Sequence, residues 1–443
     1  MSTAIPRYPG QPIVGSLPEI RRDVLGMLRG MAALGDIVSY RFGPSTEIFV
    51  NSPELVGQIL VDEAEHWEKV AQIRLLRPLV GNGLVSSPNE FHRRQRKLVA
   101  PAFQHRRVAS YADTMVRHAE DCVAGWADGE TIDVANQMMQ LSLRIVCQTL
   151  FSSDIQSEAD RVGAAMTKVI RTFTDYLRSF PPIPLSVPLP RNRAAKRAIA
   201  ELDAVIFRII AERRADPADR GDLLSMLLAA HDEDDGSFMT DQQVRDEVMT
   251  LFVGGHETTA LALSWAWAML DSHPDEAACL RAEADVALAG RSPVFADLTR
   301  LPYAAQVFKE SLRICPPVAL IGRNASRDSV LGGHPVKKGT NVTFAPYTIH
   351  RRTDIYPDPE RFDPDRFLPE NEARIPRHGF LPFGGGPRIC IGNQFAMMEG
   401  QLLLATIAQR VELSLVPGYQ VEPDPQLTLR IKGGLPMTVR RRA

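Results

Sequence analysis

The sequence contains few cysteines, and none of them has the spacing that disulfide frameworks or zinc sites use. Only five occur in 443 residues, and no C-x-x-C pair is present. They are Cys122, Cys147, Cys279, Cys315 and Cys390. An odd number of widely scattered thiols argues against a disulfide scaffold and against a structural zinc site. We therefore expect a protein of a reducing compartment, the cytoplasm.

Long apolar runs and an excess of one charge are also missing. No stretch of about 20 apolar residues could span a bilayer, and the N-terminus M-S-T-A-I-P-R-Y-P-G lacks the apolar core of a signal peptide. The net charge is −2, from 51 basic and 53 acidic residues. Such a balance gives no general attraction to nucleic acid. We expect no membrane anchor and no nucleic-acid partner.

Linkers and repeats are absent as well, which bears on domain organisation. A chain of this length usually forms two or three domains, because single cores rarely grow past about 250–300 residues. No low-complexity tract or fixed-period repeat divides this chain. We therefore predict one domain over residues 1–443, in which some feature lets a single core grow large.

The residue patterns predict a mainly α chain with a small β region. Residues 37–60 alternate as a β-hairpin followed by a helix over 53–63, and residues 318–345 and the C-terminal end add short strands. The longest predicted helix covers 241–272, and another covers 302–314.

Two local signals bound the long helix. Thr240 and Gln243 have the spacing of a capping box, and Pro274 enforces a stop. At about 1.5 Å per residue the helix is about 48 Å long and could cross a whole domain.

A glycine-rich loop with a cysteine near its end, F-G-G-G-P-R-I-C-I-G, occupies residues 383–392. Three successive glycines permit positive φ and the close approach of another group. Cys390 precedes a predicted amphipathic helix, whose N-terminus favours the thiolate. From the residues alone, Cys390 is a nucleophile, a redox thiol, a metal ligand or a buried structural cysteine.

The centre of the long helix reads G-G-H-E-T-T, residues 254–259. Two glycines inside a helix cost about 1 kcal/mol each relative to alanine, and they indicate a groove or a kink. Glu257 and Thr258 stand beside them among apolar residues. This acid–alcohol pair could pass protons, or Thr258 could bond back to a carbonyl one turn earlier.

Two further charged motifs are ambiguous when taken alone. E-S-L-R places Glu310 and Arg313 on one helix face, where such pairs are usually exposed and weak. H-R-R-Q-R-K, residues 92–97, is either a solvated basic face or an anion clamp with His92 and Arg96 one turn apart. Arg323 and Arg388 are further candidates for binding carboxylates, which arginine holds with two parallel hydrogen bonds.

In their order and combination, these motifs resemble the cytochrome P-450 superfamily, in its soluble bacterial form. F-G-G-G-P-R-I-C-I-G matches the heme-binding signature F-x-x-G-x-R-x-C-x-G, and G-G-H-E-T-T matches the oxygen-activating motif [A/G]-G-x-[D/E]-T-[T/S]. E-S-L-R matches E-x-x-R, and F-D-P-D-R-F, residues 362–367, resembles the segment that supplies a second arginine, Arg366. The resemblance extends from about residue 37 to the end.

The resemblance implies the cofactor heme b (iron protoporphyrin IX), buried between the central helix 241–272 and the cysteine loop with its following helix, 383–410. Cys390 would be the axial ligand of the iron, and Phe383 would pack beside its sulfur. His92 stands where many members of the family have tryptophan. The implied heme-binding residues are His92, Arg96, Arg323, Arg388, Phe383, Gly384 and Gly392.

The resemblance also implies roles for residues on the opposite face of the heme and for a group of buried charged residues. Glu257 and Thr258 would deliver protons with ordered water, while Gly254 and Gly255 would open the helix to admit oxygen. Glu310, Arg313 and Arg366 would form a buried structural network.

The implied activity is that of a monooxygenase, which inserts one atom of O2 into an apolar organic substrate by hydroxylation or epoxidation. With no flavin or ferredoxin-like extension visible, we expect electrons from a ferredoxin or flavodoxin and an NAD(P)H-dependent reductase, acting on a monomer. A basic docking face could comprise Arg93, Arg94, Lys97, Arg106 and Arg107, which could equally be a solvated surface.

Three other readings remain open. The first is a heme-thiolate enzyme that uses or rearranges peroxide, and the second is a non-catalytic heme sensor. The third is a heme-free cysteine protein. The intact Glu257–Thr258 pair favours oxygen activation.

The resemblance places the substrate pocket among residues 70–90, 249–257, 318–322 and 424–429. The expected lining residues are Val318, Ala319, Leu320, Ile321 and Leu427. Their aliphatic character suggests a terpenoid, a fatty acid or a macrolide-like compound. The proline-rich segment F-P-P-I-P-L-S-V-P-L-P, residues 180–190, is expected at the substrate entrance, either as a mobile flap or as a rigid turn.

Overall fold

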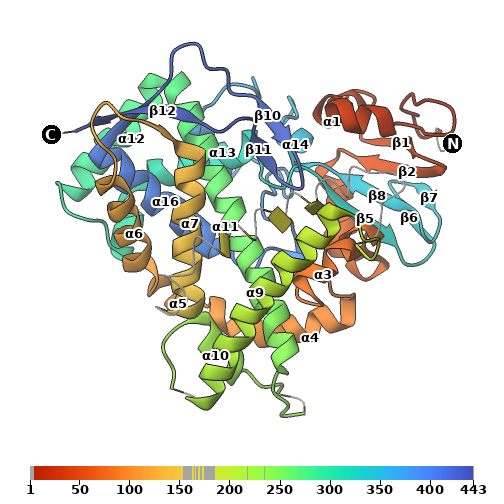
Figure 1. Ribbon diagram of the computed structural model, residues 1–443. Helices are drawn as coiled ribbons and strands as arrows, with labels where there is room; N and C mark the ends of the chain where they lie inside the picture. Colours follow the sequence, from red (N-terminus) through yellow and green to blue (C-terminus); the bar gives the residue numbers. More distant parts are fainter. Residues whose placement is uncertain are drawn as a thin grey trace.

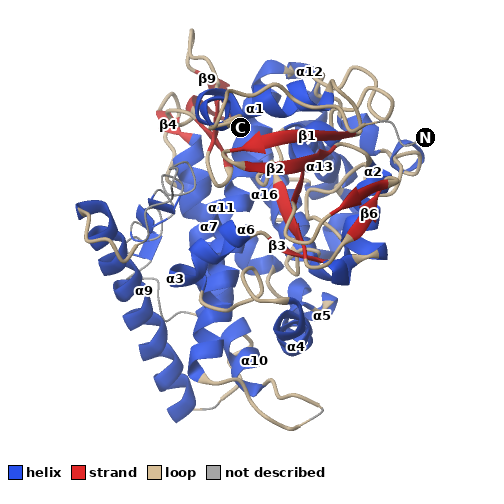
Figure 2. Cartoon of the chain, turned by 90° about the vertical axis from the view of Figure 1, so that its right-hand side faces the viewer, coloured by secondary structure: helices blue, strands red, loops and turns tan. Residues whose placement is uncertain are grey.

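A computed structural model describes residues 4–152, 162–163, 165, 168–169, 172–173, 185–216, 218–233 and 235–442. The chain is mainly helical with small sheets, as the sequence predicts (Figure 1, Figure 2). Strands β1 (Ile37–Phe42) and β2 (Ser45–Val50) lie beside the N-terminus, whereas β12 (Pro436–Arg441) lies on the other side of the molecule, near the C-terminus (Figure 1). Of the predicted entrance segment, residues 180–184 lie outside the described residues.

The N-terminal β region is a mixed five-stranded sheet in the order β1-β2-β8-β5-β3. Strand β2 pairs with β8 in parallel, and the other neighbours are antiparallel. The sheet therefore joins the predicted hairpin to β5 and β8, which come much later in the chain. Its strands are β1 (Ile37–Phe42), β2 (Ser45–Val50), β3 (Trp67–Lys69), β5 (Ile321–Ala325) and β8 (Asn341–Phe344).

The predicted helix over 53–63 is present but changes character along its length. It begins as α2 (Pro53–Gly57), with the Ser52 side chain capping its N-terminus, and continues as a π-helical turn over Gln58–Asp62. Its carbonyl at Leu60 faces the cysteine loop closely, since a Cβ atom on Gly386 would lie only 1.7 Å from that oxygen. Local periodicity does not reveal such a tertiary approach.

Helix α11 (Asp241–Ser272) confirms the predicted bounds of the long helix. Thr240 and Gln243 form the capping box, and α12 begins directly at Pro274. Buried residues occur on every side of α11, which is typical of a helix surrounded by others. It crosses the molecule, with α7 running alongside it (Figure 1). Helices α7 (Val134–Phe151), α9 (Pro190–Ala215), α13 (Pro302–Ile314) and α16 (Asn393–Arg410) all contact it.

Other helices and strands complete the described parts of the chain. The other helices are α1 (Leu17–Ala32), α3 (Arg77–Val80), α4 (Asn89–Val99), α5 (His105–Ala109), α6 (Ala112–Ala124), α10 (Leu223–Ala229), α12 (Pro274–Leu288), α14 (Pro346–Ile349) and α15 (Pro369–Glu372). The other strands are β4 (Thr131–Asp133), β6 (Ser329–Leu331), β7 (His334–Val336), β9 (Val411–Leu415), β10 (Pro423–Pro425), β11 (Leu429–Ile431) and β12 (Pro436–Arg441). Strands β4, β12 and β9 form one sheet, and β10 and β11 form a hairpin.

The buried apolar side chains form two clusters. The larger one lies among the helices and includes Val248, Leu263, Phe308 and Leu403. The smaller one, with Phe344 among its members, lies beneath the mixed sheet. Within the described residues, no helix has both the length and the apolar character needed to cross a membrane.

Candidate active site

The cysteine loop is held in one shape by glycines and by a backbone hydrogen bond. Gly384 and Gly386 have φ values of +70° and +63°, a region that favours glycine. The contact with Leu60 admits no Cβ at Gly386, whereas Gly384 faces open space. The Cys390 N–H donates to the Phe383 carbonyl at 2.9 Å, which closes the loop. The two positive-φ glycines were expected from the sequence, and the loop presents Cys390 in a fixed position.

The Cys390 thiol is accessible although it lies deep in the fold. Burial raises its pKa, and a hydrogen bond from the Gly392 N–H and the charge of Arg96 only partly offset that effect. The expected bias towards thiolate is therefore wrong for the protein alone, because α16 begins only at Asn393 and burial outweighs its dipole. A metal cation bound to the sulfur reverses this balance, since coordinated thiols are deprotonated.

The centre of α11 contains an exposed residue in a largely buried helix. Gly254 is exposed, and no atom lies within 4 Å of the position that a Cβ would take. Gly255 instead faces the Val146 side chain at 3.1 Å. The Thr258 hydroxyl donates to the Gly254 carbonyl, one turn earlier, as one of the two sequence readings predicts. Gly254 and Thr258 thus lie together at an open part of the helix surface.

Glu257 and its neighbour Thr258 bind different partners. Its side chain is 1% exposed and forms an ion pair with Arg430 of β11, whose Nε lies 2.6 Å from Oε1. The Thr428 hydroxyl donates to the same oxygen at 3.0 Å. Sequence reasoning missed Arg430, because it lies 173 residues away and belongs to no motif.

Five basic residues from four parts of the chain form a partly or fully buried cluster. Burial, followed by the repulsion of Arg388 and its neighbours, lowers the pKa of His92 to about 3. Burial and nearby arginines lower the pKa of both Arg323 and Arg388 to about 10. We call it the propionate cluster after the role that the resemblance implies, and its members are Lys69, His92, Arg96, Arg323 and Arg388.

Lys69 is the member that sequence reasoning missed. It lies directly opposite Arg323 where β3 pairs with β5, and burial and the nearby arginines lower its pKa well below the usual value. Like charges directly opposite in a ladder destabilise it. The signal was hidden because β3 itself was not predicted. Glu68 is an acid whose charge acts on Arg388, but burial and Arg96 outweigh its effect on the pKa of Arg388. The cluster therefore fits a ligand that carries two carboxylates.

Two of these cations also hold the cysteine loop. Arg96 donates to the Ile389 carbonyl at 2.7 Å. Arg388 donates to the Ser87 carbonyl at 2.9 Å and to Oδ1 of Asn89 at 2.8 Å. Porphyrin propionates would therefore meet cations that are positioned by the same loop that presents the thiol.

Glu310 and Arg313 form a buried network rather than a surface pair. Both side chains are fully buried, with bonds of 2.6 and 2.8 Å between the guanidinium and the two carboxylate oxygens. Arg366 approaches Oε1 of Glu310 at 3.4 Å. Burial raises the pKa of Glu310, although Arg313 and the Asp363 N–H oppose that shift. The network has the composition that the resemblance implied.

A histidine absent from the sequence predictions joins this network to the cysteine loop. The His350 ring is fully buried, and its Nε2 accepts the Leu381 N–H at 2.9 Å. Its Nδ1 must therefore carry the proton and donate to the Arg313 carbonyl at 3.2 Å. Burial and the charge of Arg313 lower the pKa of His350 to about 3, so the ring stays neutral.

The expected substrate residues lie on two segments that the fold joins. The Leu429 N–H donates to the Pro317 carbonyl at 2.9 Å, which brings residues 318–321 beside the β10–β11 hairpin. Val318 and Leu320 are 37% and 40% exposed. Ala319, Ile321 and Leu427 are half-buried.

Two arginines of the suggested basic docking face already form ion pairs within the chain. Arg94 donates to Asp232 at 2.6 Å, to Asp235 at 2.7 Å and to Ser237 at 2.8 Å. Arg107 lies 3.6 Å from Asp219. These ion pairs reduce the positive charge that the face offers.

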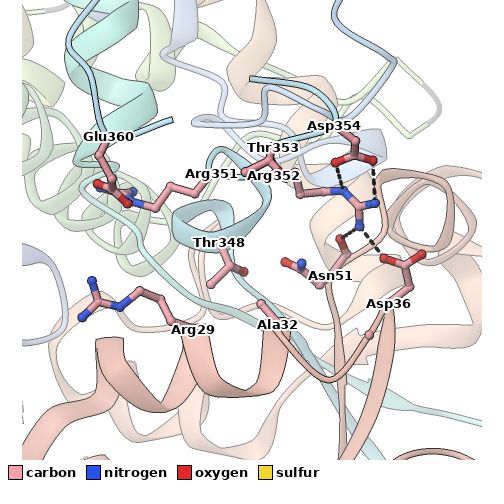
Figure 3. A pocket seen from close by; sticks show the side chains of 11 residues that line it. Arg29, Ala32, Asp36, Asn51, Thr348, Arg351, Arg352, Thr353, Asp354 and Glu360 are labelled. Atoms are coloured by element: carbon pink, nitrogen blue, oxygen red, sulfur yellow. Dashed lines mark hydrogen bonds and ion pairs between the residues drawn. The ribbon is translucent and has the colours of Figure 1, made fainter. Parts of the chain in front are cut away.

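A polar cavity of about 370 Å³ lies between α1, α14 and the segment that follows α14 (Figure 3). It contains none of the expected site residues. Arg352 binds Asp354 and Asp36, and Arg351 binds Glu360. A cavity walled by such ion pairs does not suit an apolar substrate, so we do not regard it as the active site.

Comparison with known proteins identifies the family. The sequence profile of the family described as "Cytochrome P450" matches residues 6–436. Cyclooctatin synthase of Streptomyces melanosporofaciens is 40% identical, with 95% of this chain and 92% of that protein covered. Cyclooctat-9-en-7-ol 5-monooxygenase of the same organism is 36% identical, with 92% and 89% covered. Pentalenene oxygenase of Streptomyces avermitilis is 34% identical, with 93% and 92% covered.

A solved structure agrees with these relatives. The crystal structure of the cytochrome P450DA heme domain superposes with a TM-score of 0.89 at 27% sequence identity, covering 99% of this chain and 98% of that one. This chain therefore belongs to the cytochrome P450 family, and it is a heme-dependent oxidoreductase that incorporates oxygen from O2.

Proposed function

We propose that this cytochrome P450 oxidises an apolar cyclic terpenoid by inserting one oxygen atom into it. The observation that carries the proposal is the combination of Cys390, the propionate cluster and the open surface at Gly254 in one fold. The overall reaction consumes O2, two electrons and two protons, and it releases the oxidised substrate and one water. When bound, the heme iron activates O2, and thiolate ligation favours cleavage of the O–O bond.

The cysteine loop and the propionate cluster would hold the heme. We assign Cys390 as the axial ligand, with the Gly392 N–H bonding its sulfur. Hydrogen bonds to a ligating sulfur tune the potential of the metal. Lys69, Arg96, Arg323 and Arg388 would bind the propionates by charge, and His92 would contribute as a neutral hydrogen-bonding ring.

Proton delivery would use the acid and the alcohol at the centre of α11. The Thr258 hydroxyl donates a hydrogen bond to the Gly254 carbonyl, so its oxygen is free to accept another. Glu257 would take protons from water and pass them towards Thr258. A positioned general acid of this kind typically contributes 10²- to 10⁴-fold to a rate.

The substrate class is supported by two kinds of observation. The exposed residues Val318 and Leu320, beside the β10–β11 hairpin, offer an aliphatic surface. Two of the relatives carry the compound names cyclooctat-9-en-7-ol and pentalenene, an unsaturated alcohol and an alkene. Of the three substrate classes that the sequence suggested, these names favour a terpenoid over a fatty acid or a macrolide.

Electrons would come from a separate protein. Cytochromes P450 need redox partners, and we propose a ferredoxin or flavodoxin with an NAD(P)H-dependent reductase. Arg93 and Arg106 have no ion-pair partner among the described residues. Their charges could therefore bind a partner protein, whereas Arg94 is already paired within the chain. An acidic partner would therefore be steered to this face at low ionic strength.

A screen of ligand-induced spectral shifts tests the proposal. Purified heme-loaded protein would be titrated with pentalenene, a cyclic diterpene alcohol, palmitate and a macrolide aglycone, and each binder would then be tested for turnover with ¹⁸O2 and a surrogate ferredoxin and reductase. We expect a spin-state shift and ¹⁸O incorporation with a terpenoid. Turnover with palmitate or the macrolide alone contradicts the substrate class. Turnover that requires peroxide instead of O2 contradicts oxygen activation.

A further inference from the structure

The ion pair of Glu257 is unusual in its geometry. Nε and Nη2 of Arg430 and the Thr428 hydroxyl all donate to Oε1. Oε2 accepts no hydrogen bond from the residues that the structure describes. One carboxylate oxygen is thus fully engaged with β11, and the other is left to interact with water or a neighbouring group.

The strand that carries Arg430 is clamped to α11 and to the segment before β5. The Trp265 Nε1–H donates to the Leu429 carbonyl at 2.9 Å, and the Leu429 N–H donates to the Pro317 carbonyl at 2.9 Å. Because side chains alternate along a strand, Thr428 and Arg430 share a face while Leu429 points into the core. The guanidinium therefore reaches Glu257 from a backbone that is fixed on both sides.

A second carboxylate lies on β10, the strand that pairs with β11. Asp424 of β10 is the direct cross-strand partner of Arg430. Another titratable group beside Arg430 is His256, whose pKa falls to about 4 through burial and then through the charge of Arg430. That ring therefore stays neutral at physiological pH and adds no charge beside Arg430.

On the proposed role of Glu257 in proton delivery, we propose that Arg430 is a positioning residue. It holds the Glu257 carboxylate ionised and turned towards the β10–β11 hairpin, and Asp424 accepts the guanidinium whenever Glu257 turns back towards Thr258. The hairpin turn also contains Leu427, a proposed substrate contact. A substrate that contacts Leu427 and the ion pair of Arg430 would therefore both act on the β10–β11 hairpin. The hairpin thus links proton delivery to the presence of substrate.

Infrared spectroscopy of the heme-loaded protein tests the ionisation directly, without turnover. The buried Glu399 carboxyl already gives the wild type a protonated-carboxyl band at neutral pH. We expect Arg430→Gln to show an additional band of this kind, absent in the wild type and lost in the Arg430→Gln/Glu257→Gln double variant. Arg430→Lys keeps the charge and should not show the band. Arg440→Gln, which removes an 80% exposed arginine 3.6 Å from Glu412, is the matched control and should also lack it. A wild-type spectrum for Arg430→Gln overturns the proposal.

A second measurement follows proton delivery with dioxygen as the only added reactant. Reduced protein is mixed with oxygenated buffer, and its return to the ferric state is timed in H2O and D2O, together with the yield of peroxide. We expect Arg430→Gln to move the pH profile of the rate by at least one pH unit towards alkaline pH, with Arg430→Lys close to wild type. Asp424→Asn should slow the step without producing the infrared band. An unchanged profile in Arg430→Gln overturns the proposal.

The two failures can be told apart. If Glu257→Gln leaves the solvent isotope effect and the peroxide yield unchanged, the proposed role of Glu257 fails, while the infrared result still decides whether Arg430 sets its ionisation. If Arg430→Gln does not yield folded protein, Thr428→Val removes one donor to the same oxygen, and a smaller shift of the profile in the same direction is expected. No shift in Thr428→Val and a normal Arg430→Lys profile would then contradict the positioning role.

Discussion

The Leu381 N–H donates to Nε2 of His350 at 2.9 Å, and this bond connects the Glu310–Arg313 network to the chain just before the cysteine loop. Ring contacts with Phe380, at a centroid distance of 5.2 Å, accompany the bond. The link explains how a network without any direct contact to the thiol can hold the loop that carries it.

We predict that His350→Ala destabilises the protein by about 1–3 kcal/mol, because it leaves a buried N–H of Leu381 without an acceptor. His350→Gln, whose side-chain oxygen can accept that bond, should lose less. Urea unfolding of both variants measures the difference, and the thiolate-specific Soret shift of the reduced CO complex reports whether the loop is intact. Equal losses in the two variants would contradict the link.

The buried ion pair predicts the largest effect in the protein. Glu310→Ala leaves Arg313 charged and fully buried without its carboxylate partner, which costs about 3–5 kcal/mol. We expect no soluble heme-loaded protein from this variant. Arg366→Ala should be milder, since Arg366 approaches the carboxylate at only 3.4 Å. Recovery of normal Glu310→Ala holoprotein would refute the structural role of the network.

The contact between Gly386 and Leu60 predicts a strict requirement for glycine. Gly386→Ala combines positive φ with a Cβ 1.7 Å from a backbone oxygen, so the loop must move and heme incorporation should fail. Gly129→Ala is the matched control, because Gly129 has φ +76° but open space around it. That control should lose only about 1–2 kcal/mol. Similar heme contents in the two variants would show that the contact is unimportant.

Lys69→Met should have opposite effects on the heme-free and the heme-loaded protein. Without propionates, removing one of several repelling cations should stabilise the fold by on the order of 1 kcal/mol. With heme, the same change removes a cation from the proposed propionate site and should speed heme loss. Unfolding of the apoprotein and transfer of heme to apomyoglobin measure the two effects. A loss of stability in both states would contradict the assignment of the propionate cluster.

Glu399 predicts a pH dependence of stability. Burial raises its pKa from 4.5 to about 8, and the Ser142 hydroxyl, which donates to Oε1 at 2.9 Å, offsets only part of that effect. Between pH 4.5 and 8 the folded protein keeps this proton and the unfolded chain does not. Its contribution to stability is therefore full below pH 4.5 and falls as pH rises through 8.

Glu399→Gln removes this titration while its amide oxygen can still accept from Ser142. The unfolding free energy of the variant relative to wild type should thus increase by up to about 1.4 kcal/mol per pH unit between pH 4.5 and 8. Chemical unfolding at half-unit steps of pH measures the trend. A difference that does not vary with pH would mean that Glu399 is ionised in the folded protein.

Much of the fold could be predicted because its signals are local. The bounds of α11 follow from the four-residue capping box Thr240–Gln243 and from Pro274, and the positive-φ turn of the cysteine loop follows from its own glycines. Strands β3 and β4 were not predicted, since three residues such as Trp67–Lys69 are too few for an alternating pattern to appear.

By itself, the sequence indicated the family: the motifs around Cys390, Glu257–Thr258 and Glu310–Arg313 point to one family without any coordinates. Only the tertiary structure decided their partners. Arg430 meets Glu257 across 173 residues, Lys69 meets Arg323 across a strand pair, and His350 meets Leu381 through a buried ring. Each partner is a common residue type in an unremarkable local context. Its role exists only where folding removes water and leaves a charge or an N–H that must be matched.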